Sequence, residues 1–168
     1  MSCLIRPVQS ADAPAITTLI NAIIRTGGLT IMTEPFSAAD QAAFIAGLPP
    51  RSTYLAAVDP LSGALLGVQD VLPLDAGEAA LRHVGVISTF VAQASARQGV
   101  GSALMRASLA QAHSLGYLKL HATIRADNPA ALAFYQAQGF RQAARLEKHA
   151  FIQGVFVDEF LFVRWLAG

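Results

Sequence analysis

Hydrophobic and polar positions along the chain switch repeatedly between the period of a strand and that of a helix. A short apolar segment at residues 4–8 predicts a strand, and apolar residues at helical spacing between Ser10 and Gly27 predict a helix after it. Ser37 and Asp40 have the spacing of a capping box, so a second helix is expected to begin there.

The rest of the pattern continues this alternation and ends on two adjacent strands. Apolar runs at 53–58 and 64–72 flank a turn-rich loop and predict a hairpin. The elements predicted after it are, in order, a strand at 81–91, a helix that ends at Gly116, a strand at 118–124, a short helix from Asn128 to Gly139, and strands at 144–153 and 155–165. This order predicts an α/β fold in which helices cover the faces of a mixed sheet. No repeat or low-complexity linker marks a boundary, so residues 1–168 are expected to form one domain.

Composition narrows the class of protein. Of the 168 residues, 54% are hydrophobic and 14% are charged, which excludes a disordered protein. The net charge of +1 gives no electrostatic basis for binding nucleic acid or an anionic membrane, and no apolar run is long enough to span a bilayer. Such a composition indicates a large core or a subunit interface, and we predict a homodimer that binds neither nucleic acid nor membrane.

Cysteine and histidine usage bears on the compartment and on metals. Cys3 is the single cysteine, so no internal disulfide forms, as is typical of a reducing compartment. The first residues lack the basic and apolar regions of a secretory signal, which predicts a cytoplasmic protein. The four histidines have no tight ligand spacing, so we expect no bound metal.

Gly99 and Gly101 form a turn between an apolar strand and a helix. Glycine lets the backbone approach a ligand closely, and the N-terminus of a helix attracts anions, so this turn predicts a site for a phosphate or pyrophosphate. A P-loop is excluded because no lysine follows Gly101, and a dinucleotide fingerprint is excluded because Leu104 is bulky. Arg97 is the nearest cation. An ordinary turn is the alternative interpretation.

Two segments carry a resemblance to a known family. Ala96–Leu104, preceded by Val91, resembles the acetyl-CoA pyrophosphate loop of the GCN5-related N-acetyltransferases (GNAT), whose pattern is Gln/Arg-x-x-Gly-x-Gly/Ala. Ile124–Phe140 is similar to the second motif of that family, which joins the fifth strand to the fourth helix. The resemblance implies a single-domain GNAT fold with a mixed, mostly antiparallel sheet of about six to seven strands flanked by about four helices. Ala96 departs from the pattern, so binding is expected to depend on backbone N–H groups.

The resemblance also implies acetyl-CoA as the cosubstrate and direct transfer of the acetyl group to an amine. Cys3 has no evident base beside it, which agrees with transfer without an acyl-enzyme. The strand end Thr89–Val91 is expected to pair with the pantetheine amides and to supply an oxyanion donor. The implied cofactor-binding residues are Thr89, Phe90, Val91, Arg97, Gln98, Gly99, Val100, Gly101, Ser102, Asn128, Ala131 and Tyr135.

Tyr135 is the predicted catalytic acid. A phenol with a pKa of about 10 stays protonated at neutral pH, so it can give its proton to the departing thiolate. Asn128 and Tyr135 lie seven residues apart, about two helical turns, with Ala131 between them, where a small side chain leaves room for the pantetheine arm. A tyrosine packed in the core and an asparagine that only caps its helix are the alternatives.

The general base remains open. Many relatives carry a glutamate on the fourth strand, but the corresponding stretch Val84–Ser88 has none. His83 and Glu34 are candidates, His121 and His149 are weaker ones, and water is another possible proton acceptor.

The acceptor is predicted from a weaker resemblance. Ile20–Gly27 and Thr33-Glu34-Pro35 resemble the phosphinothricin and L-amino-acid N-acetyltransferase branch, which implies a primary amine of a small molecule, such as an amino acid or an analogue. Two alternatives stay open: an enzyme that acetylates the N-terminus of a peptide or protein, and a CoA-binding regulatory module without catalysis.

Overall fold

A seven-stranded sheet forms the centre of the protein. The computed structural model describes residues 3–166, and its strands lie in the order β1-β2-β3-β4-β5-β7-β6. Their bounds are β1 Leu4–Pro7, β2 Thr53–Val58, β3 Leu65–Pro73, β4 Val84–Val91, β5 Lys119–Arg125, β6 Arg141–Ile152 and β7 Val155–Trp165. The pair β4–β5 is parallel and the other five pairs are antiparallel, which confirms the predicted α/β class with a mixed, mostly antiparallel sheet.

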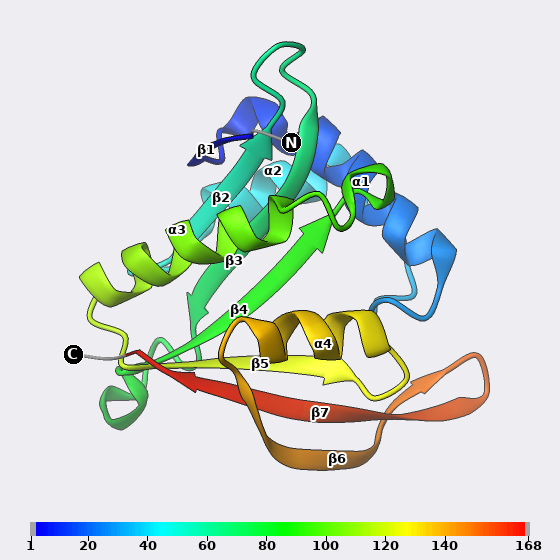
Figure 1. Cartoon of the computed structure of the whole chain (residues 1–168), viewed down its shortest axis with the longest axis vertical. Coiled ribbons are helices and arrows are strands. Elements are labelled where there is room, and N and C mark those ends of the chain that lie inside the picture. The colour runs from blue at the N-terminus through cyan, green and yellow to red at the C-terminus, as the bar shows by residue number, and fades with distance from the viewer. Residues whose placement is uncertain (1–2, 167–168) are drawn as a thin grey trace.

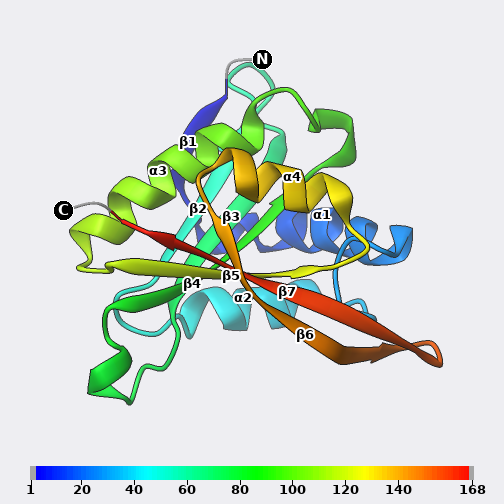
Figure 2. The same cartoon turned by 60° about the horizontal axis from the view of Figure 1, so that its bottom comes forward.

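Two pairs of helices cover the two faces of this sheet. Helices α3 (Val100–Ser114) and α4 (Pro129–Ala137) lie on one face, and α1 (Ala13–Thr26) and α2 (Ala38–Ala46) lie on the other (Figures 1 and 2). Apolar side chains of each pair pack into separate clusters against the sheet, as the amphipathic spacing predicts. No helix within residues 3–166 is both long and apolar enough to cross a membrane.

Local signals in the sequence set most element boundaries. The predicted capping box is present, since the Ser37 hydroxyl accepts from the Asp40 amide at 3.1 Å and the Asp40 carboxylate accepts from the Ser37 amide at 2.9 Å. Gly139 adopts the left-handed conformation with φ +79° after α4, which also confirms its predicted place.

Three predicted boundaries differ from the structure. Short 3₁₀ turns account for two of them, and strand pairing that begins earlier than predicted accounts for the third. The first helix opens with a 3₁₀ turn, η1 (Ser10–Asp12), and a second turn, η2 (Ala79–Leu81), delays β4 until Val84. Strand β6 begins at Arg141, where residue 144 was expected, because Arg141 already pairs with Val163 of β7. A third turn, η3 (Gln93–Ser95), lies in the connection that follows β4.

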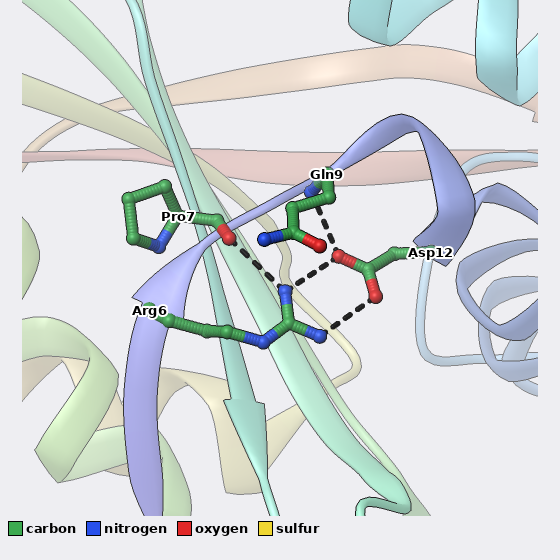
Figure 3. A network of polar contacts seen from close by, with 4 residues as sticks. All are labelled: Arg6, Pro7, Gln9 and Asp12. Carbon is green, nitrogen blue, oxygen red and sulfur yellow. Dashed lines mark hydrogen bonds and ion pairs between the residues drawn. The ribbon is translucent and has the colours of Figure 1, made fainter.

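An ion pair fixes the passage from β1 to α1. The Arg6 guanidinium makes two hydrogen bonds to the Asp12 carboxylate at 2.7 and 2.8 Å and a third to the Pro7 carbonyl at 3.1 Å (Figure 3). The Gln9 amide donates to the same carboxylate at 2.8 Å. These bonds, led by the side-chain bonds to Arg6, hold the pKa of Asp12 below its ordinary value. These contacts join β1, at the edge of the sheet, to the start of α1.

Candidate active site

The parallel strands β4 and β5 separate part of the way along their length. They pair only where Val84–Val86 meets Lys119–His121, and beyond these positions they diverge (Figure 1). Among the described residues, the remainder of β4 therefore has no neighbouring strand on the β5 side. Two cavities reach this opening and share the residues Leu29, Thr89, Phe90, Ala131 and Tyr135.

The first cavity, of about 340 Å³, is called here the glycine-turn cavity. Ten of the twelve predicted cofactor-binding residues line it: Thr89, Phe90, Val91, Arg97, Gly99, Gly101, Ser102, Asn128, Ala131 and Tyr135. The other two turn their side chains elsewhere. Val100 is buried in the core, and the Gln98 amide donates to the Ala94 carbonyl at 2.8 Å, so their backbone N–H groups are the parts that can meet a ligand.

The glycine turn presents unpaired donors. Within residues 3–166, the backbone N–H groups from Arg97 to Ser102 donate to no acceptor of the chain. Arg97 and Gly99 have positive φ values of 60° and 85°, which bend the backbone tightly before α3. The N-terminus of a 15-residue helix adds its positive dipole end, so this wall of the cavity suits an anion.

Gly101 of α3 lies against Phe134 of α4 at the glycine-turn cavity. A Cβ placed on Gly101 would lie 3.0 Å from the Phe134 ring. Even an alanine at this position would require the Phe134 ring to shift by a few tenths of an ångström, and glycine also leaves the backbone open to a ligand.

Tyr135 lies where the two cavities meet. Its ring packs edge-on against Phe134 and Phe140, and its hydroxyl lies 2.9 Å from that of Thr89. The Gln69 side-chain amide donates to the same Thr89 oxygen at 2.7 Å, which fixes the threonine in place. Burial raises the pKa of Tyr135 to about 12, so the phenol is protonated at neutral pH.

Asn128 caps α4 and also anchors a loop. Its Oδ1 atom accepts from the Ala131 amide at 3.1 Å, as predicted for an N-cap, and its Nδ2 atom donates to the Leu29 carbonyl at 3.3 Å. The bond to Leu29 holds the α1–α2 connection against the start of α4, beside the opening between β4 and β5.

The second cavity, of about 390 Å³, is called here the open-face cavity. Residues 29–32 of the α1–α2 connection form one wall, and residues of β4, β5, α4, β6 and β7 form the others. Arg125 lies in its wall, but it binds the Asp127 carboxylate through two bonds at 2.7 and 2.8 Å and the Thr30 carbonyl at 3.1 Å. Its charge is therefore already paired.

Glu159 is a carboxyl group in this wall that the sequence analysis did not single out as a site residue. It is 3% exposed, and its Oε2 atom has no hydrogen-bond partner within residues 3–166. The half-exposed His149 places its Nε2 atom 3.6 Å from that oxygen. Burial raises the pKa of Glu159, and the nearby His149 and Arg125 oppose the rise.

Asp70 is a second carboxyl group that was missed. It lies on β3 opposite Ser88 of β4 and lines a third cavity, of about 380 Å³, that shares Met32, Ser88 and Phe90 with the open-face cavity. It is 7% exposed, and its Oδ1 atom has no partner in the described part of the chain. Burial raises the pKa of Asp70 to about 7, against the opposing effect of hydrogen bonding from Ser88. A carboxyl group inside an apolar strand is the sequence signal that could have indicated both residues.

One of the predicted base candidates lines a cavity at the opening. His149 lines the open-face cavity, whereas His83, His121 and Glu34 line neither it nor the glycine-turn cavity. Burial lowers the pKa of His121, with Lys119 adding to the effect. No group of three or more His, Cys, Asp or Glu side chains within residues 3–166 is arranged to hold a metal ion.

Comparison with known proteins identifies the class. Residues 21–140 match the model of the acetyltransferase (GNAT) family. The chain therefore belongs to this family of acetyltransferases, as the two sequence motifs predicted. No curated protein sequence matches it.

Solved structures with the same fold cover nearly the whole chain. A phosphinothricin acetyltransferase from Sinorhizobium meliloti, in complex with acetyl-CoA, has a TM-score of 0.90 at 23% identity, over 99% of this chain and 90% of its own. An N-acetyltransferase from Staphylococcus aureus Mu50 has a TM-score of 0.90 at 20% identity, over 99% and 100%. A ribosomal-protein-alanine N-acetyltransferase from Brucella melitensis has 0.87 at 22%, over 97% and 99%. At these identities the likeness demonstrates the fold.

Proposed function

We propose that the protein transfers an acetyl group from acetyl-CoA directly to a primary amine of a small molecule. The observation that carries this proposal is that Tyr135, whose hydroxyl lies 2.9 Å from that of Thr89, lines both the glycine-turn cavity and the open-face cavity. A cofactor in one cavity and an amine in the other would meet at this hydroxyl.

The glycine-turn cavity is the proposed site of acetyl-CoA. The unpaired N–H groups from Arg97 to Ser102 would bind the pyrophosphate, and Arg97 is the local cation for it. Beyond Val86, the free edge of β4 offers backbone groups that would pair with the pantetheine amides as an added strand does. The path of the pantetheine arm would be lined by Asn128, Ala131 and Tyr135. The structure of the Sinorhizobium meliloti relative in complex with acetyl-CoA supports this cosubstrate.

The transfer requires three events, and the chain offers a group for each. A neutral amine attacks the thioester carbon, and a backbone N–H at the end of β4 would stabilise the oxyanion that forms. Collapse of that intermediate expels the CoA thiolate, which takes the proton of Tyr135. The nitrogen loses a proton, and the products are an amide and free CoA.

Asp70 is the proposed acceptor of the nitrogen's proton, directly or through one water molecule. Ser88 lies beside it on the neighbouring strand and lines both the Asp70 cavity and the open-face cavity. A base works best when its pKa is close to the working pH, and the pKa of Asp70 is raised to about 7. Asp70 thus takes precedence over His83 and Glu34, which line none of the three cavities.

A small amine fits the open-face cavity better than a folded protein surface does. The cavity of about 390 Å³ is closed on one side by residues 29–32, which Arg125 and Asn128 hold in place. Acetylation of a peptide N-terminus and a non-catalytic CoA-binding role are the competing functions. We further propose that residues 1–168 act as one domain, that the protein works in the cytoplasm, and that it forms a homodimer.

Thiol release from acetyl-CoA across a panel of primary amines tests this function. We expect turnover in the wild type, and a fall in kcat of roughly 10²-fold or more in Tyr135→Phe, because the thiolate then lacks its acid. The acetyl-CoA Kd should change little, since the phenyl ring is retained. Thr123→Ser, a change in the open-face cavity wall that leaves the Tyr135 hydroxyl in place, is the matched control.

The outcomes separate the competing functions. Tight acetyl-CoA binding without turnover of any amine would favour the regulatory module. Turnover of peptides alone would favour the N-terminal acetyltransferase. Turnover that Tyr135→Phe does not change would remove the acid assignment and leave the enzyme.

A further inference from the structure

Two polar side chains on neighbouring strands lead from the core of the sheet to the Tyr135 hydroxyl. Gln69 of β3 and Thr89 of β4 are register partners, so their side chains leave the sheet on the same face. The Gln69 Nε2 atom donates to the Thr89 Oγ1 atom at 2.7 Å, and that oxygen lies 2.9 Å from the Tyr135 hydroxyl. The three groups form a chain of hydrogen bonds that ends at a residue lining both the glycine-turn cavity and the open-face cavity.

Gln69 is a polar residue in a fully buried position. It is 0% exposed, and its Oε1 atom has no hydrogen-bond partner within residues 3–166. A buried amide with an unpaired oxygen destabilises the fold, whereas an apolar side chain of similar volume would not. Among the described residues, the bond to Thr89 is the one hydrogen bond that this side chain makes, so its effect on Thr89 is what the amide contributes.

The bond from Gln69 determines what the Thr89 hydroxyl can do. A hydroxyl group has one hydrogen and two lone pairs, and Gln69 occupies one of the lone pairs. The hydrogen is left for donation to the Tyr135 oxygen. An amide that donates to a hydroxyl oxygen also polarises the O–H bond and makes that hydroxyl a stronger donor. When Thr89 donates, the phenolic oxygen is the acceptor, and the phenolic hydrogen is left for another group.

We propose that Thr89, supported by Gln69, is a positioning residue for proton transfer: its hydroxyl donates to the Tyr135 oxygen, directs the phenolic hydrogen toward the departing sulfur and stabilises the phenolate that forms. The role rests on the proposed function, in which Tyr135 is the acid. In this step the O–H bond of Tyr135 breaks and an S–H bond forms on the CoA thiolate. The phenolate regains a proton from water after CoA leaves.

The surroundings of Tyr135 explain why such a donor matters. Burial raises the pKa of Tyr135 to about 12, the hydrogen bond with Thr89 opposes the rise, and the charge of Asp70 adds to it. The bond with Thr89 is therefore the interaction that favours the phenolate. A hydrogen bond to a charged oxygen is stronger than one to a neutral oxygen, so this bond strengthens as the proton leaves. An interaction that strengthens toward the transition state raises kcat.

Thr89→Val tests this role, because valine has nearly the shape of threonine and lacks the hydroxyl. We expect kcat for an amine that the wild type acetylates to fall about tenfold or more, since a charge-assisted hydrogen bond is lost. The acetyl-CoA Kd should change less than about twofold, because the backbone groups of β4 are retained. Thr89→Ser restores the hydroxyl and should recover most of the lost kcat.

A double-mutant cycle distinguishes action through Tyr135 from a structural effect of Thr89. In Tyr135→Phe the phenolic oxygen is absent, so adding Thr89→Val should lower the residual kcat by less than about twofold. A threonine that only shapes the site would give the same fall in both backgrounds. Gln69→Met removes the donor to Thr89 and should lower kcat by about threefold or more, which keeps the role testable if Thr89→Val folds poorly.

Thr53→Val is the matched control. Thr53 is a buried threonine of β2 whose hydroxyl also binds a glutamine side chain, that of Gln111, but it lines neither the glycine-turn cavity nor the open-face cavity. This variant should keep the kcat of the wild type.

Three results would overturn the role of Thr89 and leave the proposed function intact. They are an unchanged kcat in Thr89→Val (or in Gln69→Met, where Thr89→Val does not fold), no recovery in Thr89→Ser, and an equal effect of Thr89→Val in the wild-type and Tyr135→Phe backgrounds. Full activity of Tyr135→Phe would overturn the acid assignment together with this role. Absence of turnover by the wild type with every amine would overturn the proposed function as well.

Discussion

Asp70 is a carboxyl group held inside an apolar part of the sheet, where its ionised form is unfavourable. Its pKa is raised to about 7 from an ordinary value of 3.8, because burial penalises the charge. Perturbed carboxyl groups next to cavities concentrate at functional sites, which supports the assignment of Asp70 as the base. The same perturbation makes a prediction about stability.

Between pH 4 and 7, Asp70 is protonated in the folded chain and ionised in the unfolded chain, so unfolding releases a proton. The contribution of Asp70 to the free energy of unfolding therefore falls as the pH rises from 4 to 7, and it stays low above pH 7. Asp70→Asn cannot ionise. We expect its free energy of unfolding to equal that of the wild type near pH 4 and to exceed it at pH 8, by an amount on the order of 4 kcal/mol.

Urea unfolding at a series of pH values measures this difference. Glu147→Gln, which removes an exposed carboxyl group, should show no such increase. A constant difference between Asp70→Asn and the wild type across pH 4–8 would contradict the raised pKa. Loss of the ionisation near pH 7 from the pH profile of kcat/KM in Asp70→Asn would support the base assignment independently.

At the scale of elements, Arg51 closes the C-terminal end of α3. Its Nε and Nη2 atoms donate to the Leu115 carbonyl at 3.1 and 2.9 Å, and its Nη1 atom donates to the Arg82 carbonyl at 2.7 Å. The guanidinium also lies 4.5 Å from the centre of the Tyr117 ring. One side chain thus joins the end of α3 to the segment before β4, and so supports the two elements that border the glycine turn.

Replacing this side chain should loosen that junction. Arg51→Ala leaves two carbonyl groups without their charged donor, so we expect a loss of about 2 kcal/mol and a fall in Tm of about 4–8 °C. Thermal unfolding followed by circular dichroism measures it. Arg82→Ala, at an exposed position next to the same carbonyl, should change Tm by less than about 2 °C. An equal fall in Tm in the two variants would mean that the loss of a positive charge, and not the loss of the Arg51 hydrogen bonds, lowers the stability.

At the scale of the whole molecule, exposed apolar side chains cluster at the tip of the β6–β7 hairpin. Phe151, Val155 and Phe156 are 64%, 63% and 58% exposed, and the two phenylalanine rings lie 4.7 Å apart. An exposed patch of this kind is typical of an interface, and the same patch on a second copy would be self-complementary about a two-fold axis.

The predicted homodimer can be tested at this hairpin. We expect a dimer for the wild type and a monomer for the double variant Phe151→Ser/Phe156→Ser, because the substitution removes most of the apolar area at the tip. Sedimentation equilibrium measures both. Leu61→Ser, at a residue that is 97% exposed in the β2–β3 loop, should remain dimeric. A wild type that stays monomeric would refute the prediction.

Signals that are local in the sequence predicted the helices and strands and the turn at Gly99 and Gly101. The capping box at Ser37, the cap at Asn128 and the glycines of the turn act on neighbouring residues, so their signals are readable along the chain. Periodicity likewise predicted the seven strands and four helices, apart from short 3₁₀ turns and strand ends, which depend on pairing with distant residues.

The features of the open-face cavity and of the Asp70 cavity follow from contacts between residues far apart in the sequence. The opening between β4 and β5 arises from strand pairing that stops at Val86, and no local pattern specifies where pairing ends. Asp70 and Glu159 became candidates because the strand order and register bury them on the walls of connected cavities. Their burial, like that of Val100 in the core, depends on residues far apart in the sequence, so it follows from packing and not from periodicity.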